Sequence, residues 1–115
     1  GDLIASGDAD VGLDLTVGGF RRMTPTVITY TSGALTPVGS FQPVIITASR
    51  SLTNVTVLPA GTEVTFYNAG QVTYTLTFSD ATPLRLGGNR ALGQYDSLTL
   101  YSDGTQWIET SFTNN

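Results

Sequence analysis

The 115-residue chain contains no cysteine, no histidine and no lysine, and each absence excludes a kind of chemistry. Without cysteine there is no disulfide and no thiolate metal site, so cysteine usage indicates no compartment. Without histidine, the chain by itself cannot form a Ser-His-Asp triad or a histidine-ligated zinc site. The net charge of −4 argues against a nucleic-acid partner, because that binding draws mostly on Lys and Arg. No apolar run approaches the ~20 residues of a membrane-spanning helix, so we expect no membrane span.

The chain does contain a repeated alternation of apolar and polar residues. Successive side chains of a β-strand point to opposite faces, so alternation lets one face pack while the other meets water. The apolar sets expected to face the interior are Val64 and Phe66, then Val72, Tyr74, Leu76 and Phe78, and then Leu98 and Leu100. Turn residues separate these runs, as in Asn68-Ala69-Gly70 and Asp103-Gly104. No helical period appears, so the pattern predicts an all-β fold, a jelly-roll-like antiparallel β-sandwich.

Residues 1–23 differ from the rest of the chain, because the segment is rich in Asp and Gly and its only clear alternation is Leu13, Leu15 and Val17. We expect it to be an extended stem or lead-in segment, and residues 24–115 to form the β-sandwich domain. Within that domain, the run from Val44 to Ile46 is apolar without alternation. Such a run implies burial on both faces, either inside a sandwich or against another subunit. Together with a lead-in that cannot fold alone, it favours a homotrimer.

Three phrases of the sequence resemble one family of viral proteins. The run Leu13-Asp14-Leu15-Thr16-Val17-Gly18-Gly19 resembles the "nLtvgG" phrases of bacteriophage tail-fibre stems. The runs VLPAGTEVTFYNAG and DSLTLYSDGTQWIE resemble the C-terminal tip domains of trimeric phage tail fibres, tail spikes and tail needles. The resemblance covers roughly two thirds of the chain. It implies a homotrimer of jelly-roll-like protomers at the end of a fibrous stem, on a virion, contacting a host surface. Because these tips vary greatly, it carries over no binding residue.

The segment from Ala81 to Gln94 is the best candidate for a binding surface, because its proline and glycines predict a long surface loop. The candidate ligand-binding residues in or beside it are Arg85, Asn89, Arg90, Gln94 and Tyr95. Arginine can hold a carboxylate or phosphate with two parallel hydrogen bonds, and tyrosine offers an aromatic face and a hydroxyl that suit sugars. In a chain without lysine, these arginines favour an anionic cell-surface glycan. The alternative is that they pair with acids of a neighbouring subunit.

Carboxylates raise the questions of metal binding and catalysis. Asp8, Asp10 and Asp14 have the spacing of alternate Ca²⁺ ligands, but Gly19 stands where an EF-hand loop needs its last acid. The carboxylates that could in principle supply a glycosidase pair are Glu63, Asp80, Asp96, Asp103 and Glu109. Asp96 and Asp103 flank a short strand and are more simply explained as turn residues. We therefore predict no enzymatic activity, no cofactor and no metal, and we expect Trp107 to be a core residue rather than a sugar platform.

These observations favour a non-enzymatic, structural and host-receptor-binding tip domain of a trimeric bacteriophage tail fibre or spike, located on the virion. Its expected partners are copies of itself, the remainder of the fibre, and a host cell-surface polysaccharide or lipopolysaccharide. One alternative is a stand-alone carbohydrate-binding module of a secreted bacterial protein, which would be monomeric with exposed aromatic residues on one sheet. Another is a virion decoration or spike protein with no ligand.

Overall fold

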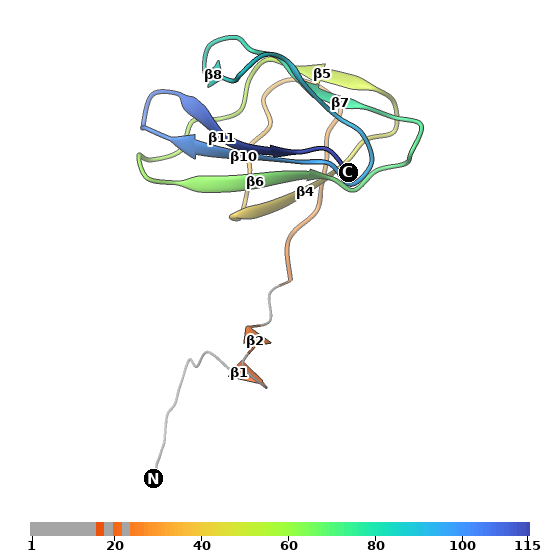
Figure 1. The fold of residues 1–115 in the computed structure, drawn as a ribbon, viewed down its shortest axis with the longest axis horizontal. Helices are drawn as coiled ribbons and strands as arrows, with labels where there is room; N and C mark the ends of the chain where they lie inside the picture. The colour runs from red at the N-terminus through yellow and green to blue at the C-terminus, as the bar shows by residue number, and fades with distance from the viewer. Residues whose placement is uncertain (1–15, 18–19, 22–23) are drawn as a thin grey trace.

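The computed structural model of the protein describes residues 16–17, 20–21 and 24–115, and every regular element among them is a β-strand (Figure 1). The strands are β1 (Thr16–Val17), β2 (Phe20–Arg21), β3 (Ile28–Thr29), β4 (Phe41–Ile45), β5 (Arg50–Leu52), β6 (Glu63–Asn68), β7 (Leu76–Phe78), β8 (Leu84–Arg85), β9 (Arg90–Leu92), β10 (Ser97–Ser102) and β11 (Trp107–Thr113). The prediction of an all-β fold is confirmed for this part of the chain. No helix in it is long and apolar enough to cross a membrane.

Residues 24–115 form two sheets that pack face to face in a sandwich-like arrangement. One sheet has six strands in the order β3-β4-β6-β10-β11-β8, and the other has three in the order β5-β7-β9. β6, β10 and β11 are antiparallel neighbours, but β3–β4, β4–β6, β5–β7 and β11–β8 are parallel pairs. The prediction of an antiparallel sandwich is therefore wrong, since both sheets are mixed. The reason lies in the connections: after β4 the chain crosses to β5 in the other sheet, and it returns at β6 running in its original direction.

The core lies between the two sheets and consists mainly of apolar side chains, with Gln42, Asn68 and Ser102 also fully buried. The ring of Phe66 lies 5.3 Å from that of Phe78 in the facing sheet and 6.5 Å from that of Trp107, centroid to centroid. Trp107 is fully buried, and its indole N–H lies 3.3 Å from the carbonyl oxygens of Val55 and Thr56. A buried indole needs such a partner for its N–H. The expectation that Trp107 is a core residue is confirmed.

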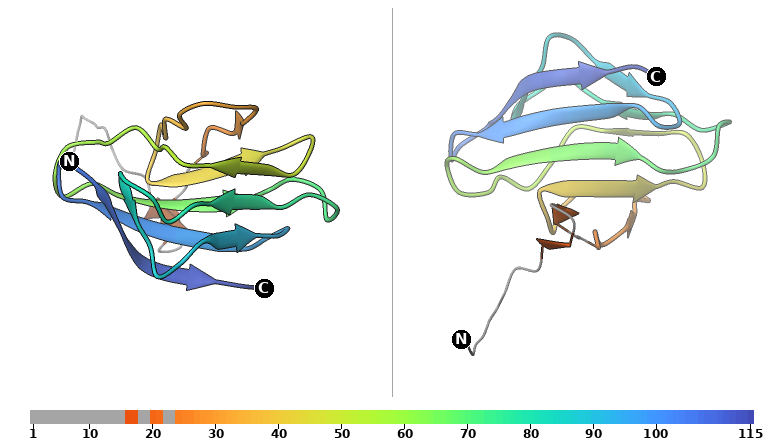
Figure 2. Two further views of the ribbon diagram at one scale, coloured as in Figure 1. Left: turned by 90° about the horizontal axis from the view of Figure 1, so that it is seen from above. Right: turned by 60° about the horizontal axis from the view of Figure 1, so that its bottom comes forward.

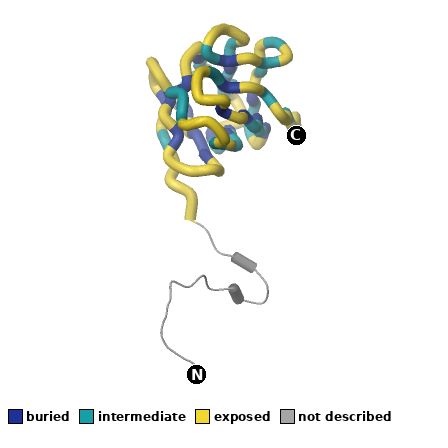
Figure 3. Tube along the Cα trace, turned by 90° about the vertical axis from the view of Figure 1, so that its left-hand side faces the viewer, coloured by how far each residue is buried: buried dark blue, intermediate teal, exposed yellow. Residues whose placement is uncertain are grey.

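Alternation predicted the inward face correctly where a strand forms, and it failed where a turn replaces the strand. Val64 and Phe66 in β6 are buried, as are Leu98 and Leu100 in β10. In the predicted set that begins at Val72, Leu76 and Phe78 are also buried, but Val72 itself is 75% exposed. The N–H of Tyr74 donates to the carbonyl of Gln71, which closes a turn before β7 begins. Placing Val72 on the inward face was therefore wrong. Figure 3 shows the buried positions gathered inside the domain.

The apolar run in and after β4 is buried on one face only within a single chain. Val44 and Ile46 are buried against the core, whereas Ile45 between them is 36% exposed and Phe41 is 39% exposed. These two exposed residues lie on the outer face of the six-stranded sheet. In the right-hand view of Figure 2, this face lies in front, and β5 and β7 lie behind it. No other described strand of residues 24–115 covers it.

The predicted stem falls mostly outside the described residues. Within it, β1 and β2 pair antiparallel, with Thr16 opposite Arg21 and Val17 opposite Phe20. The calcium-like spacing of Asp8, Asp10 and Asp14 lies in the part that the structure does not describe.

Candidate functional site

The segment from Ala81 to Gln94 is not one long loop, because two short strands divide it. Leu84 in β8 and Leu92 in β9 are both fully buried, and these side chains anchor the segment to the core. β8 pairs with β11 at the edge of the six-stranded sheet, whereas β9 pairs with β7 in the other sheet. The loop prediction was wrong here because the buried leucines are too widely spaced to show an alternating pattern. The strands separate the five candidate residues into two groups.

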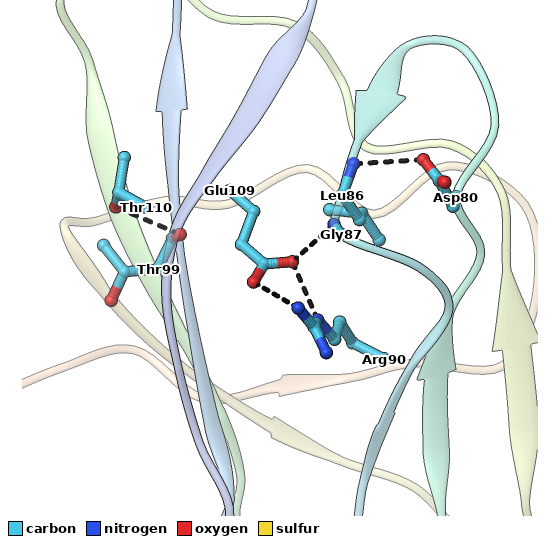
Figure 4. A network of polar contacts seen from close by, with 7 residues as sticks. All are labelled: Asp80, Leu86, Gly87, Arg90, Thr99, Glu109 and Thr110. Atoms are coloured by element: carbon cyan, nitrogen blue, oxygen red, sulfur yellow. Dashed lines mark hydrogen bonds and ion pairs between the residues drawn. The ribbon is translucent and has the colours of Figure 1, made fainter.

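The first group is centred on Arg90, whose charge is already matched within the chain (Figure 4). Its Nε and Nη2 donate to the two carboxylate oxygens of Glu109, each at 2.8 Å. The N–H of Gly87 donates to the same carboxylate at 3.0 Å, and the guanidinium lies 4.9 Å from the ring centroid of Phe112. The side chains of Arg90 and Glu109 are 28% and 14% exposed. Because β9 and β11 belong to different sheets, this ion pair joins the two layers.

The ion pair also changes the ionisation of both partners. The hydrogen bonds from Arg90 hold the pKa of Glu109 below its ordinary value. Burial raises this pKa by less than those bonds lower it, and the Gly87 N–H adds a smaller lowering. The hydrogen bond to Glu109 raises the pKa of Arg90. An arginine held bidentately by a carboxylate offers little of its charge to an anionic ligand. The sequence left open that the arginines pair with acids of a neighbouring subunit, whereas Arg90 pairs with an acid of its own chain.

Arg85 and Asn89 complete the first group. Arg85 is exposed, and its Nε donates to Oε1 of Gln106 at 2.9 Å. The side-chain oxygen of Asn89 accepts from the N–H of Asp80 at 2.8 Å. The side chain of Asp80 in turn accepts from the N–H of Leu86 at 3.1 Å (Figure 4). Asn89 and Asp80 therefore hold the shape of the connection between β7 and β9. In this group, Arg85 alone presents an exposed cationic side chain.

The second group, Gln94 and Tyr95, lies in the turn between β9 and β10. The side chain of Gln94 donates to the carbonyl of Gly70 at 3.0 Å. The ring of Tyr95 is 51% exposed and stacks on the ring of Tyr67, with centroids 6.1 Å apart and planes 18° apart. On its other side, Tyr67 contacts Phe41, whose centroid is 5.6 Å away. Phe41, Tyr67 and Tyr95 form a line of three rings on the outer face of the six-stranded sheet, called here the ring row.

The ring row brings one predicted residue together with two that the sequence reasoning missed. Phe41 and Tyr67 belong to β4 and β6, far in sequence from Tyr95. One signal was available: the alternation that placed Val64 and Phe66 inward placed Tyr67 outward. A single outward aromatic residue is common on protein surfaces, but several that the fold brings together form a patch that marks a contact site. The three rings meet because β6 lies between β4 and β10, with Pro43 and Ser97 both opposite Tyr67, which the sequence pattern did not indicate.

The turn that carries Tyr95 is fixed by a dense set of hydrogen bonds. The N–H of Tyr95 donates to the carbonyl of Asn68 at 2.9 Å, and the side chain of Asn115 donates to the Tyr95 carbonyl at 2.6 Å. The buried carboxylate of Asp96 accepts from the N–H groups of Gly93 at 2.9 Å and Asn115 at 2.7 Å. The φ angle of Tyr95 is 71°, in the left-handed region that normally favours glycine. The surrounding bonds hold this unfavourable backbone angle.

The carboxylates considered for catalysis are mostly engaged in hydrogen bonds. Asp103 accepts from the backbone N–H groups of Thr105 and Gln106, both at 2.9 Å, and these bonds lower its pKa. Asp96, Asp80 and Glu109 hold the contacts given above. The prediction that Asp96 and Asp103 are turn residues is confirmed. No group of three His, Cys, Asp or Glu residues able to hold a metal ion occurs in the described part of the chain.

The fold and this surface define the class: an all-β domain of two mixed sheets in a sandwich-like arrangement, with three aromatic rings on a sheet face that no other described strand of residues 24–115 covers. No protein-family model matches the chain, and no curated protein sequence is significantly similar to it.

Proposed function

We propose that the protein is the structural and host-receptor-binding tip domain of a homotrimeric bacteriophage tail fibre or spike, with a jelly-roll-like protomer. It is located on the virion and binds a cell-surface glycan of the host without catalysis. The resemblance of the phrases around Val57–Gly70 and Asp96–Glu109 supplies the family. The contacts of the described residues supply the physical support.

The observation that carries the proposal is the unequal burial of β4. Its inner side chain Val44 is fully buried, and Ile46 just beyond is almost so, whereas Phe41 and Ile45 on the outer face remain exposed. Exposed apolar side chains grouped on one face mark a site of contact with another molecule more often than chance. In a receptor-binding trimer, exposed apolar side chains of this kind contact either a neighbouring subunit or the receptor.

The subunit contact is assigned to the edge of the six-stranded sheet at β3. β3 is only two residues long and pairs with β4 on one side, with Thr29 opposite Ile45. Val27, just before β3, is 49% exposed, so two apolar residues, Val27 and Ile45, flank this edge. The chain leads into the domain here, below β4 in Figure 1. In a trimer on a common stem, the three lead-in segments converge on the three-fold axis, so this edge would face the axis.

The absence of catalysis is supported by the carboxylates. Asp80, Asp96, Asp103 and Glu109 all accept hydrogen bonds from the chain's own backbone. A glycosidase needs two carboxyl groups free to face the scissile bond. The same groups serve here to hold turns and to join the two sheets.

Sedimentation analysis of the whole chain tests the assembly, with Ile45→Asp as the variant and Ser51→Asp as its control. Ser51 is exposed on the three-stranded sheet, so the control adds the same charge away from the β3 edge. We expect a trimer for the wild type and the control, and dissociation to folded monomers for Ile45→Asp. A monomeric wild-type protein would contradict the trimer.

One specific observation favours a second candidate, the stand-alone carbohydrate-binding module. That alternative expects a monomer with exposed aromatic residues on one sheet, and the ring row provides such residues. The same sedimentation experiment separates the two candidates, because the module would sediment as a monomer that still binds glycan. A decoration protein with no ligand would bind none.

A further inference from the structure

We infer that the ring row of Phe41, Tyr67 and Tyr95 is a binding site for the pyranose rings of an uncharged oligosaccharide. The inference rests on the proposed glycan-binding function and specifies its site and ligand class. It moves the site from the arginines to the outer face of the six-stranded sheet.

The geometry of the rings suits stacked sugars. The centroid spacings of 5.6 and 6.1 Å make a continuous line across β4, β6 and the turn before β10. One face of many pyranose rings carries only C–H groups, so it packs on an aromatic face while the hydroxyl groups point sideways to water or to polar side chains. The rings at the two ends of the row, Phe41 and Tyr95, belong to residues that are 39% and 51% exposed, and two exposed rings separated by Tyr67 favour an oligosaccharide over a single sugar.

The backbone of Tyr95 indicates that the residue is held in a conformation of unfavourable energy. Its φ angle of 71° would be free of strain for glycine, yet the position holds one of the larger side chains. Such strain persists only where the surroundings impose it, and it is concentrated at functional sites. Here the bonds from Asn115 and to Asn68 impose it, and the buried Asp96 carboxylate joins the N–H of Gly93 in the turn to the N–H of Asn115. The ring is therefore presented in a preset orientation, which reduces the entropy lost on binding.

The charges nearby decide between a neutral and an anionic ligand. The outward residues between and beside the rings are Pro43, Thr65, Ser97 and Thr99, and none is charged. Thr65 and Thr99 bond to each other through their hydroxyl groups at 2.9 Å. The acid nearest along β6 is Glu63, which would repel an anion. Arg90 is committed to Glu109, so it does not supply a positive charge for a sulfate or carboxylate.

The test uses the whole chain and a panel of neutral glucose, galactose and mannose oligosaccharides, with sulfated and uronic-acid counterparts. Binding is measured by array and then by calorimetry. The decisive variant is Tyr95→Gly, because glycine accepts the positive φ angle and keeps the turn. We expect the wild type to bind at least one neutral oligosaccharide and Tyr95→Gly to weaken it about tenfold or more. Tyr67→Ala should act in the same direction.

Two matched controls sharpen the result. Tyr101 is another exposed tyrosine of the same sheet, in β10 but outside the ring row, so Tyr101→Ala should leave binding unchanged. Arg85→Ala removes the exposed arginine of the first group and should also leave binding unchanged. Selective binding of anionic members, dependence on Arg85, or no binding to any neutral member would overturn the inference.

The failure of this inference is distinguishable from failure of the proposed function. If Tyr95→Gly and Tyr67→Ala still adsorb to bacterial cells as the wild type does, the ring row is not the site while the receptor-binding role stands. If Tyr95→Gly changes the sedimentation mass, the row is a contact between copies of the chain and the inference is wrong. A wild-type protein that is monomeric and adsorbs to no bacterial cells would contradict the proposed function itself.

Discussion

The two faces of the six-stranded sheet use the same kinds of residue in opposite ways. On the inner face, Phe66 and Trp107 are enclosed by the second sheet, and the Arg90–Glu109 ion pair joins the two sheets at the rim. On the outer face, Phe41, Tyr67 and Tyr95 are in contact with one another, and no other described strand of the domain covers them. The inner side chains are thus matched within the chain, and under the proposed function the outer ones contact another molecule. Changes on the two faces should therefore affect different measurements, folding for one and association or binding for the other.

The largest effect is expected from a charge placed on the inner face. Val44→Asp or Ile46→Asp buries a carboxylate without a partner, which costs several kcal/mol out of the ~5–15 that hold a domain together. We expect both variants to be largely unfolded by circular dichroism and thermal melting. Ile45→Asp, between them on the outer face, should keep the fold of the single chain. Folded protein from all three variants would contradict the difference between the faces.

Neutralising Glu109 should weaken the contact with Arg90 that joins the two sheets. Glu109→Gln removes the charge that Arg90 and the Gly87 N–H contact, so we expect a melting temperature a few degrees lower at neutral pH. Because the folded pKa of Glu109 lies below its ordinary value, its contribution is present at neutral pH and is lost as the pH falls through that folded pKa.

The control for this prediction is the pH dependence of the free energy of unfolding. The wild type should lose more stability than Glu109→Gln between neutral pH and about pH 3. Asp103, whose pKa is also lowered, should cause a remaining loss in both proteins. Identical slopes in the two proteins would mean that the ion pair contributes nothing to folding.

Tyr95→Gly should have a small effect on stability, because two contributions oppose each other. Relief of the positive φ angle gains about 1–2 kcal/mol, while the added freedom of glycine in the unfolded chain costs about 0.5–1 kcal/mol. The lost contact with Tyr67 reduces the gain further. We expect the free energy of unfolding to stay within about 1 kcal/mol of the wild type. A large loss in chemical denaturation would show that Tyr95 is needed for folding rather than displayed for binding.

The smallest effect is expected for Arg85→Ala. The side chain is exposed, and its recorded hydrogen bond is to the amide of Gln106, so the free energy of unfolding should change by less than about 0.5 kcal/mol. Adsorption to cells should also be unchanged if the ring row is the site. Reduced adsorption with unchanged melting would restore the arginine-bearing segment as a binding surface.

Sequence reasoning identified the residues of the interior better than it identified the site. Val64, Phe66, Leu98 and Leu100 were assigned inward correctly, because hydrophobic alternation reports directly on which face is buried. Val72 was misassigned because a turn interrupts the pattern there. Of the candidate site residues, Arg90 turned out to be paired with Glu109, 19 positions away, and such pairing leaves no local signature.

The sequence by itself determined the all-β class, the turn roles of Asp96 and Asp103, and the apolar character of the run from Val44 to Ile46. These follow from local rules, since side-chain period and turn chemistry depend only on neighbouring residues. Only the tertiary structure decided which strands run parallel, that Arg90 is neutralised, and that Phe41, Tyr67 and Tyr95 meet. Each of these depends on how the chain crosses between the two sheets. Such a crossing brings together residues that are far apart in the sequence, and no local sequence pattern indicates the contact.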